Sequence, residues 1–158
     1  MLIRKAYKFR LKTNEVLQAQ LIQLEGANRF IWNKVLDINL RRLEHPEKKH
    51  RRLLTYNDMS GLLTLWKKSE DYSFLRDAPS QTLQQTLKNL HRAFQDGFNK
   101  RQPLKRMPVF KSKKHSLGVK FPQGFKLETK RLFLPKVGWV HYFNSRKVNG
   151  LVKSMSLS

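Results

Sequence analysis

Hydrophobic residues recur along this chain with a period of about two, then of about 3.6, and then of about two again. Near the N-terminus, residues 3–11 alternate between apolar and basic side chains, which predicts a half-buried strand. The apolar face holds Ile3, Tyr7, Phe9 and Leu11, and the basic face holds Arg4, Lys8 and Arg10. The basic face either discourages aggregation of an edge strand or forms a ridge that contacts phosphates, and the pattern favours neither interpretation.

Helical spacing begins after Thr13 and Asn14, either of which can cap a helix. We expect Gly26 to end or bend this first helix, and a second helix to run to about residue 44, before the break at His45 and Pro46. The apolar stripe of the second helix consists of Trp32, Leu36, Leu40 and Leu43, widened by Ile31, Val35 and Ile38. This regular stripe predicts that Trp32 is a core residue and not a base-stacking one.

Two further helices are predicted beyond a polar and basic loop at residues 45–52. Thr55 and Asp58 form a weak capping box before the first of them. Its inward side chains are expected to be Leu62, Leu63 and Trp66. The second opens at residues 78–80 with a proline in its first turn. Its apolar face runs through Leu83, Leu87, Leu90, Phe94 and Phe98.

The polar face of this last helix begins with amides and continues with cations. The residues concerned are Gln81, Gln84, Gln85, Lys88 and Arg92. Such a face suits a groove of duplex DNA, because amides can read base edges while cations hold phosphates. An ordinary solvated helix face has the same composition, and the pattern alone favours that second interpretation.

The chain changes character at residues 99–118, where prolines and a dense basic run indicate a linker and a domain boundary. Beyond it, short apolar runs separated by Gly, Pro, Asn and Lys predict strands. These runs are residues 119–121, 125–127, 132–134, 140–143 and 151–157. The second and third runs are expected to form a hairpin around residues 129–131. Helices followed by strands make the predicted fold class α+β.

The net charge of +22 over 158 residues gives information about the binding partner of the chain in addition to its fold. Residues 97–158 contain a single acid, Glu128, and such an excess of like charge is most simply explained by a polyanionic partner. The chain has no cysteine, which excludes disulfides and thiolate chemistry and suits a reducing cytoplasm. It has no long apolar run or signal peptide, so we expect no membrane partner and a cytoplasmic, nucleoid-associated protein.

Candidate catalytic groups are sparse. The acids mostly alternate with basic residues, and the only adjacent pair is Glu70 and Asp71 at a predicted helix end. The histidines show no metal-ligand spacing: they are His45, His50, His91, His115 and His141. Because a phosphate-binding glycine loop and a nucleophile motif are also missing, we expect no catalytic residue, metal site or cofactor in this chain.

Several segments together resemble the N-terminal part of the TnpB/OrfB family of insertion-sequence proteins. They are IRKAYKFRL at 3–11, ANRFIWNK at 27–34, PSQTLQQTL at 79–87, PVFKSKK at 108–114, FPQGFKL at 121–127, LFLPKVGWV at 132–140 and GLVKS at 150–154. The resemblance covers essentially the whole chain. It implies RNA-guided DNA endonucleases encoded by bacterial transposons and related to type V CRISPR effectors.

The resemblance also implies an architecture: a helical, helix-turn-helix-like recognition domain inserted into an antiparallel β-barrel wedge domain. On this sequence, residues 1–12 would be the first wedge strand, 13–100 the recognition domain, 101–118 a basic linker, and 119–158 the remaining strands of an incomplete barrel. The family's RuvC carboxylates with their Mg²⁺, and its zinc-finger-like zinc, would lie beyond residue 158. We therefore expect a non-catalytic fragment from a frameshifted, fragmented or truncated copy, for which a separately encoded nuclease half is one candidate partner.

The family's DNA-reading positions are carried over only where the motifs match. They would be Tyr56, Ser60, Ser80, Gln81, Gln84 and Gln123. Contacts to the nucleic-acid backbone are expected from Arg4, Lys8, Arg10, Arg29, Lys88, Arg92, Lys111, Lys113, Lys114 and Lys120. The expected partners are target-adjacent DNA and a guide RNA. The alternatives are a stand-alone basic RNA-binding structural protein, such as a ribosome-associated factor, and an active nuclease, which we do not expect.

Overall fold

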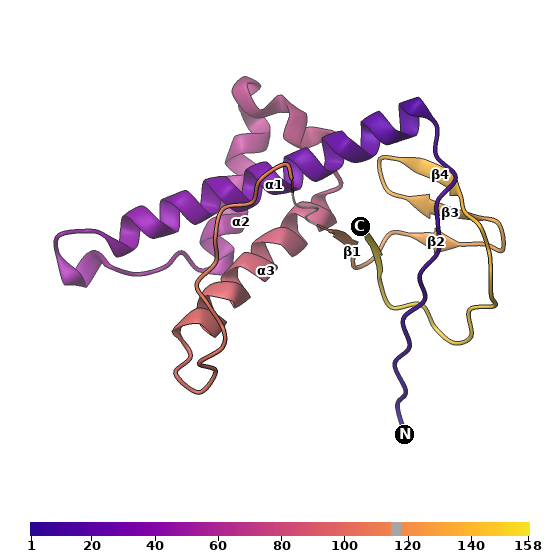
Figure 1. Ribbon diagram of the computed structural model, residues 1–158. Coiled ribbons are helices and arrows are strands. Elements are labelled where there is room, and N and C mark those ends of the chain that lie inside the picture. Colours follow the sequence, from indigo (N-terminus) through magenta and orange to yellow (C-terminus); the bar gives the residue numbers. More distant parts are fainter. Residues whose placement is uncertain (115–117) are drawn as a thin grey trace.

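The computed structural model describes residues 1–114 and 118–158 as an α+β fold (Figure 1). Its α-helices are α1 (Glu15–Leu43), α2 (Tyr56–Lys68) and α3 (Ser80–Phe98), with short 3-10 helices at Lys48–His50 (η1) and Glu70–Arg76 (η2). The strands are β1 (Val119–Phe121), β2 (Lys126–Leu127), β3 (Arg131–Leu134), β4 (Gly138–His141) and β5 (Met155–Leu157). His115 and the neighbouring part of the predicted 101–118 linker lie outside the described residues.

The longest element, α1, joins two helices that the sequence pattern separates. The Asn14 side chain caps it as predicted, since its Oδ1 accepts the Leu17 N–H at 2.8 Å. The expected helix end at Gly26 is wrong, because the helix continues through it to Leu43. A glycine costs a helix about 1 kcal/mol relative to alanine, and burial of Leu24 and Ala27 on either side offsets that cost.

The helices bury a common core where α1, α2 and α3 cross (Figure 1). Trp32 is 8% exposed, which confirms its predicted core position. The capping box of Thr55 and Asp58 is also confirmed. The predicted apolar face of α3 is buried from Leu83 to Phe94, but Phe98 is 53% exposed. The chain returning past this end of α3 packs on Gly97 through Met107, and the Phe98 ring stays at the surface. Pro79 precedes α3 as its N-cap instead of lying in the first turn.

The predicted strand at residues 3–11 is wrong in extent. Only Leu11 forms a bridge, with Tyr142, flanked by hydrogen bonds from the Lys12 N–H to the His141 carbonyl and from the Phe143 N–H to the Arg10 carbonyl. Alternation predicts an extended chain, but a strand also needs a free edge beside it along its whole length. The 2.8 and 2.9 Å bonds at this end hold the segment at β4 nevertheless.

The β part consists of two small antiparallel sheets, β1–β5 and β2–β3–β4, and the described residues form no closed barrel. The predicted hairpin is confirmed, because Lys126 and Leu127 pair with Phe133 and Leu132. Val119 and Phe121 of β1 are buried against α3 and α1. The β1–β5 sheet is therefore held directly against the helices through β1.

Candidate nucleic-acid interface

Helices α2 and α3 place several predicted DNA-reading residues in one row. At one end of the row, the Lys88 ammonium lies 5.4 Å from the centre of the Tyr56 ring. At the other end, Lys67 Nζ donates a hydrogen bond of 2.8 Å to Ser80 Oγ. The first residue of α2 therefore lies beside the middle of α3, and the last turn of α2 lies beside the first residue of α3. This order means that the two helices run antiparallel.

Ser60 and Gln84 fall between these two contacts. Ser60 follows Tyr56 by one helical turn, and Gln84 precedes Lys88 by one turn, so the antiparallel arrangement places them opposite each other. Both side chains are half-buried. Hydroxyl, amide and ammonium groups thus follow one another along the line where α2 and α3 meet.

The β part meets this row at the N-terminus of α3. A Cβ atom on Gly124 would lie 3.0 Å from Gln81 Oε1 and 3.0 Å from Cγ of Pro135. Gly124 has a φ of 81°, a backbone conformation that favours glycine, and a Cβ there would press on the Gln81 side chain. The exposed Gln123 precedes it in the same turn. The structure therefore brings Ser80, Gln81 and Gln123 to one seam between helices and strands.

Two cations that sequence reasoning missed also lie at this seam. Burial lowers the pKa of Lys67, and the nearby charge of Lys136 lowers it further. Lys136 stands in the turn between β3 and β4 with a φ of 65°. Nothing local in the sequence distinguishes these lysines from the other basic residues, because their proximity depends on how the sheet docks onto α2 and α3.

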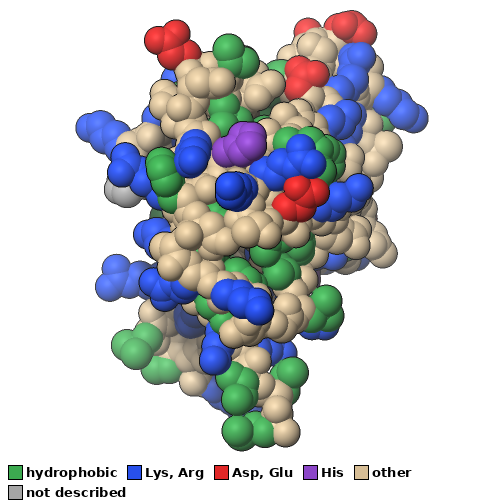
Figure 2. Space-filling model, turned by 90° about the vertical axis from the view of Figure 1, so that its right-hand side faces the viewer, with side chains coloured by type: hydrophobic (Ala, Val, Ile, Leu, Met, Phe, Trp, Pro, Cys, Tyr) green, Lys and Arg blue, Asp and Glu red, His purple; other side chains and the backbone are tan. Residues whose placement is uncertain are grey.

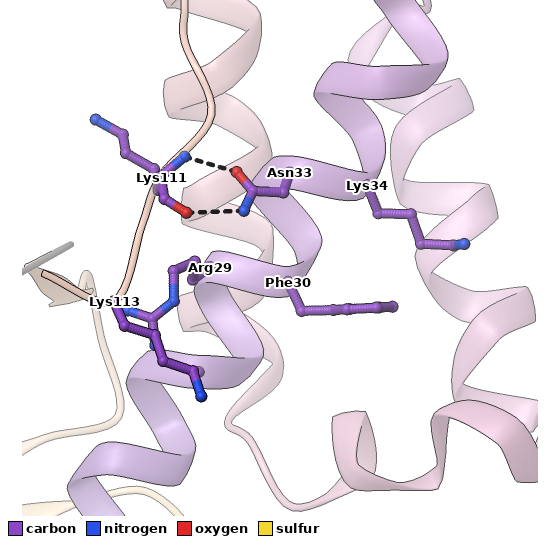
Figure 3. A pocket seen from close by; sticks show the side chains of 7 residues that line it. Arg29, Phe30, Asn33, Lys34, Lys111 and Lys113 are labelled. Atoms are coloured by element: carbon purple, nitrogen blue, oxygen red, sulfur yellow. Dashed lines mark hydrogen bonds between the residues drawn. The ribbon is translucent and has the colours of Figure 1, made fainter. Parts of the chain in front are cut away.

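A second cationic site lies beside the middle of α1. It is an open pocket of about 550 Å³ lined by Gly26, Arg29, Phe30, Asn33, Lys34, Lys111 and Lys113. Figure 3 shows Asn33 joined to the backbone of Lys111 by two hydrogen bonds, of 2.8 and 2.9 Å. In the same view Arg29 and Lys113 lie near each other, while Phe30 and Lys34 point away from the segment of residues 111–113.

The basic run that ends at Lys114 is therefore fixed to α1 over at least part of its length. Besides the Asn33 pair, the indole N–H of Trp32 donates to the Val109 carbonyl at 2.9 Å. The Lys111 ammonium lies 4.9 Å from the centre of the Trp32 ring. A segment predicted as a linker thus presents its cations from a defined position beside the helix.

The other residues predicted to contact the nucleic-acid backbone differ in how exposed their side chains are. Arg29 is only 13% exposed in its side chain and forms an ion pair with Glu25 at 3.5 Å. Arg92 is 82% exposed, with Asp96 at 4.0 Å. The remaining ones are exposed: Arg4, Lys8, Arg10, Lys88, Lys113, Lys114 and Lys120. Figure 2 shows Lys and Arg spread over one whole face of the molecule, with few acids between them.

Neither a metal site nor a membrane span is found in the described part of the chain. Across residues 1–114 and 118–158, no three His, Asp or Glu side chains gather closely enough to hold a metal ion. Of the helices in the same residues, none combines the length and apolar character that crossing a membrane requires.

Comparisons with known proteins agree with the resemblance of the motifs. Residues 1–49 match the helix-turn-helix domain model of OrfB proteins. InsQ of Escherichia coli (strain K12), provisionally named an RNA-guided DNA endonuclease, is 38% identical over 156 residues, which cover 98% of this chain and 37% of InsQ. A Streptomyces pristinaespiralis protein with the same provisional function is 32% identical over 114 residues, which cover 72% of this chain and 27% of that protein.

This chain therefore spans well under half the length of either relative. The matched region nevertheless includes nearly every residue described above, from the N-terminal segment through the helices to the strands. The matches to the domain model and to the two relatives show that the chain belongs to the TnpB/OrfB family.

Proposed function

We propose that this chain is the nucleic-acid-binding N-terminal part of a TnpB-type RNA-guided DNA endonuclease. Residues 13–100 form its helix-turn-helix-like recognition domain, inserted into an incomplete wedge barrel made by residues 1–12 and 119–158, with 101–118 as a basic connection. The order of elements supports this division, since Leu11 pairs with Tyr142 across the whole helical insertion.

The observation that carries the proposal is the convergence of amides and cations at one seam. Gln81 touches the Gln123–Gly124 turn, and Lys67 lies there partly buried and near Lys136, so that burial and the charge of Lys136 both lower the pKa of Lys67. Amides reading base edges and lysines holding phosphates are the combination that a short duplex DNA motif requires. Guide RNA is held by the exposed basic surfaces, including the 111–114 run.

Binding to duplex DNA as a function of salt tests the electrostatic part of this proposal. If about six phosphates are neutralised, log K falls with log salt at a slope of about −5. A flat response refutes it. Strong binding to structured RNA with no binding to duplex DNA supports the alternative of a stand-alone RNA-binding protein.

Base reading is tested with Gln81→Ala and Gln84→Ala against a library of duplexes. Each loss of an amide contact is expected to reduce discrimination by about 5- to 150-fold while leaving the salt slope unchanged. Gln95→Ala is the matched control, because Gln95 is an exposed glutamine further along the same helix. Equal effects of all three substitutions contradict the assignment of the seam.

A further inference from the structure

The outward face of the three-stranded sheet carries two aromatic rings that the proposed function does not use. The register of β2, β3 and β4 aligns Lys126, Phe133 and Trp139 in a single row across the sheet. The neighbouring residues of β3 and β4 point inward, and Leu132, Leu134 and Val140 are buried there. The sheet thus has one apolar face toward the core and one aromatic and cationic face outward.

The two rings are arranged as an open platform. Phe133 and Trp139 meet at 5.5 Å between centroids and 63° between planes, and Trp139 is 41% exposed. Cations flank them on both sides: the Arg131 guanidinium carbon lies 4.2 Å from the Trp139 centroid, and Lys126 Nζ lies 5.9 Å from the Phe133 centroid. Figure 2 shows this side of the molecule with hydrophobic side chains lying among Lys and Arg.

Glu128 positions the arginine of this platform. Its carboxylate accepts the Arg131 Nε–H at 2.6 Å, and this hydrogen bond raises the pKa of Arg131. The guanidinium is therefore held over the indole, and the Arg131 side chain is still 44% exposed. A nucleobase can stack on a guanidinium plane as well as on an aromatic ring, and because Glu128 neutralises Arg131, Lys126 supplies the charge for the adjoining phosphate.

The chemistry of the face selects its occupant. The bases of a DNA duplex are already stacked on each other, so only an unpaired nucleotide can offer a π-face to these rings. In the proposed function the DNA is a duplex read at the seam, and the RNA is the partner that contains unpaired nucleotides. We propose, resting on that function, that Phe133, Trp139 and Arg131 stack unpaired nucleotides of RNA, with Lys126 on the phosphates.

The alternative is that the ladder of rings and cations only stabilises a small sheet. Titration of the whole chain with an unstructured RNA of about eight nucleotides separates the two. Trp139→Ala is expected to weaken binding by about 5- to 150-fold, and Trp139→Phe to retain most of the affinity. The matched control is Phe98→Ala, which removes a ring that is 53% exposed, more than Trp139, at the far end of α3 and is expected to change nothing. Unchanged binding by Trp139→Ala, or equal loss in the control, overturns the proposal.

A second readout does not depend on how well the alanine variant folds. RNA is expected to protect the wild-type chain against acrylamide quenching of tryptophan fluorescence, and this protection is expected to disappear in Trp139→Phe. The remaining tryptophans are Trp32, which is 8% exposed, and the half-buried Trp66. Protection that persists in Trp139→Phe overturns the platform.

The outcome also separates this inference from the proposed function. If the affinity for RNA does not depend on Trp139 while Gln81→Ala still weakens duplex binding, the platform is refuted and the proposed function stands. If the chain binds neither RNA nor DNA, both fail. Binding of single-stranded DNA that is as tight as that of RNA and equally dependent on Trp139 overturns the assignment to RNA.

Discussion

The pair of hydrogen bonds between Asn33 and Lys111 offers a direct test of how the basic segment is held. Asn33 Nδ2 donates to the Lys111 carbonyl at 2.9 Å, and the Lys111 N–H donates to Asn33 Oδ1 at 2.8 Å. Replacing Asn33 by alanine removes both bonds. It leaves the neighbouring bond from Trp32 to Val109 in place.

The size of the effect follows from the number and burial of the bonds. A partly buried hydrogen bond contributes about 0.5–1.5 kcal/mol net, so the loss of two amounts to about 1–3 kcal/mol. Because Asn33 holds a surface segment and not the core, this energy acts on the docking of residues 109–113. The undocked fraction is expected to rise by about 5- to 150-fold, and global stability is expected to fall less.

Limited trypsin digestion followed by mass spectrometry measures this opening. Cleavage after Lys111 and Lys113 is expected to accelerate in Asn33→Ala by the factor given above, since cleavage tracks the open population when reclosing is fast. The exposed loop at residues 45–52 serves as the internal reference. Asn57→Ala, at an exposed asparagine in the first turn of α2, is the control variant. An unchanged ratio of the two cleavage rates refutes the idea that these bonds hold the segment.

Three further predictions concern stability and its pH dependence. Asn28→Ala removes the acceptor of the 2.7 Å hydrogen bond from the buried Thr86 hydroxyl, so it is expected to lower the free energy of unfolding by about 1–3 kcal/mol and to lower the thermal midpoint. The double variant with Thr86→Val is expected to lose less stability than the sum of the two single variants. Lys34→Met removes an ammonium that lies 4.7–5.7 Å from three aromatic rings, and urea unfolding should show a loss of about 0.5–2 kcal/mol that Lys34→Arg partly restores. Hydrogen bonds from the backbone N–H and the hydroxyl of Thr55 lower the pKa of Asp58, so its stabilisation is present above the ordinary carboxyl pKa of 3.8 and is lost as pH falls through the lower folded value. Thermal unfolding of Asp58→Asn from about pH 5 to about pH 2 should show a smaller acid-induced decrease than the wild-type chain, and identical profiles would contradict this reasoning.

Features set by neighbouring residues could be predicted from the sequence. The Asn14 cap, the capping box at Thr55 and the burial of Leu83 to Phe94 each depend on side chains within a few turns of one helix, and each is confirmed. The hairpin of β2 and β3 is similarly local. In these cases the period of the pattern and the chemistry of the ends contain the information.

The errors arise where distant parts of the chain decide the outcome. Gly26 carries a local signal for a helix end, but the packing of the flanking apolar residues outweighs it. Residues 3–11 carry a strand pattern, but only the last part finds a partner edge, at Tyr142. The buried amides of Asn28 and Asn39 could not be predicted, because each satisfies a polar group contributed from outside α1.

The candidate site shows the same division. The residue types on α3 were accessible to pattern analysis, but nothing local could place Gln81 against Gly124 or Lys67 near Lys136. Those contacts come from the docking of the sheets on the helices. The DNA-reading and backbone-contacting assignments remain predictions that the substitutions above can test.

The way the helical insertion is attached bears on how the seam works. On entering the helices, the chain is bonded to β4 through Lys12 and His141, and on leaving them it is bonded to α1 through Asn33 and Lys111. Beyond the second anchor, β1 packs directly on α1 and α3. A seam fixed at both ends has little freedom to lose when nucleic acid binds, so more of the contact energy remains as affinity. Loosening the Lys111 anchor by Asn33→Ala should therefore weaken RNA binding through the 111–114 run while leaving base discrimination at Gln81 intact, because β1 still packs on α1 and α3, and Gly124 still packs on Gln81.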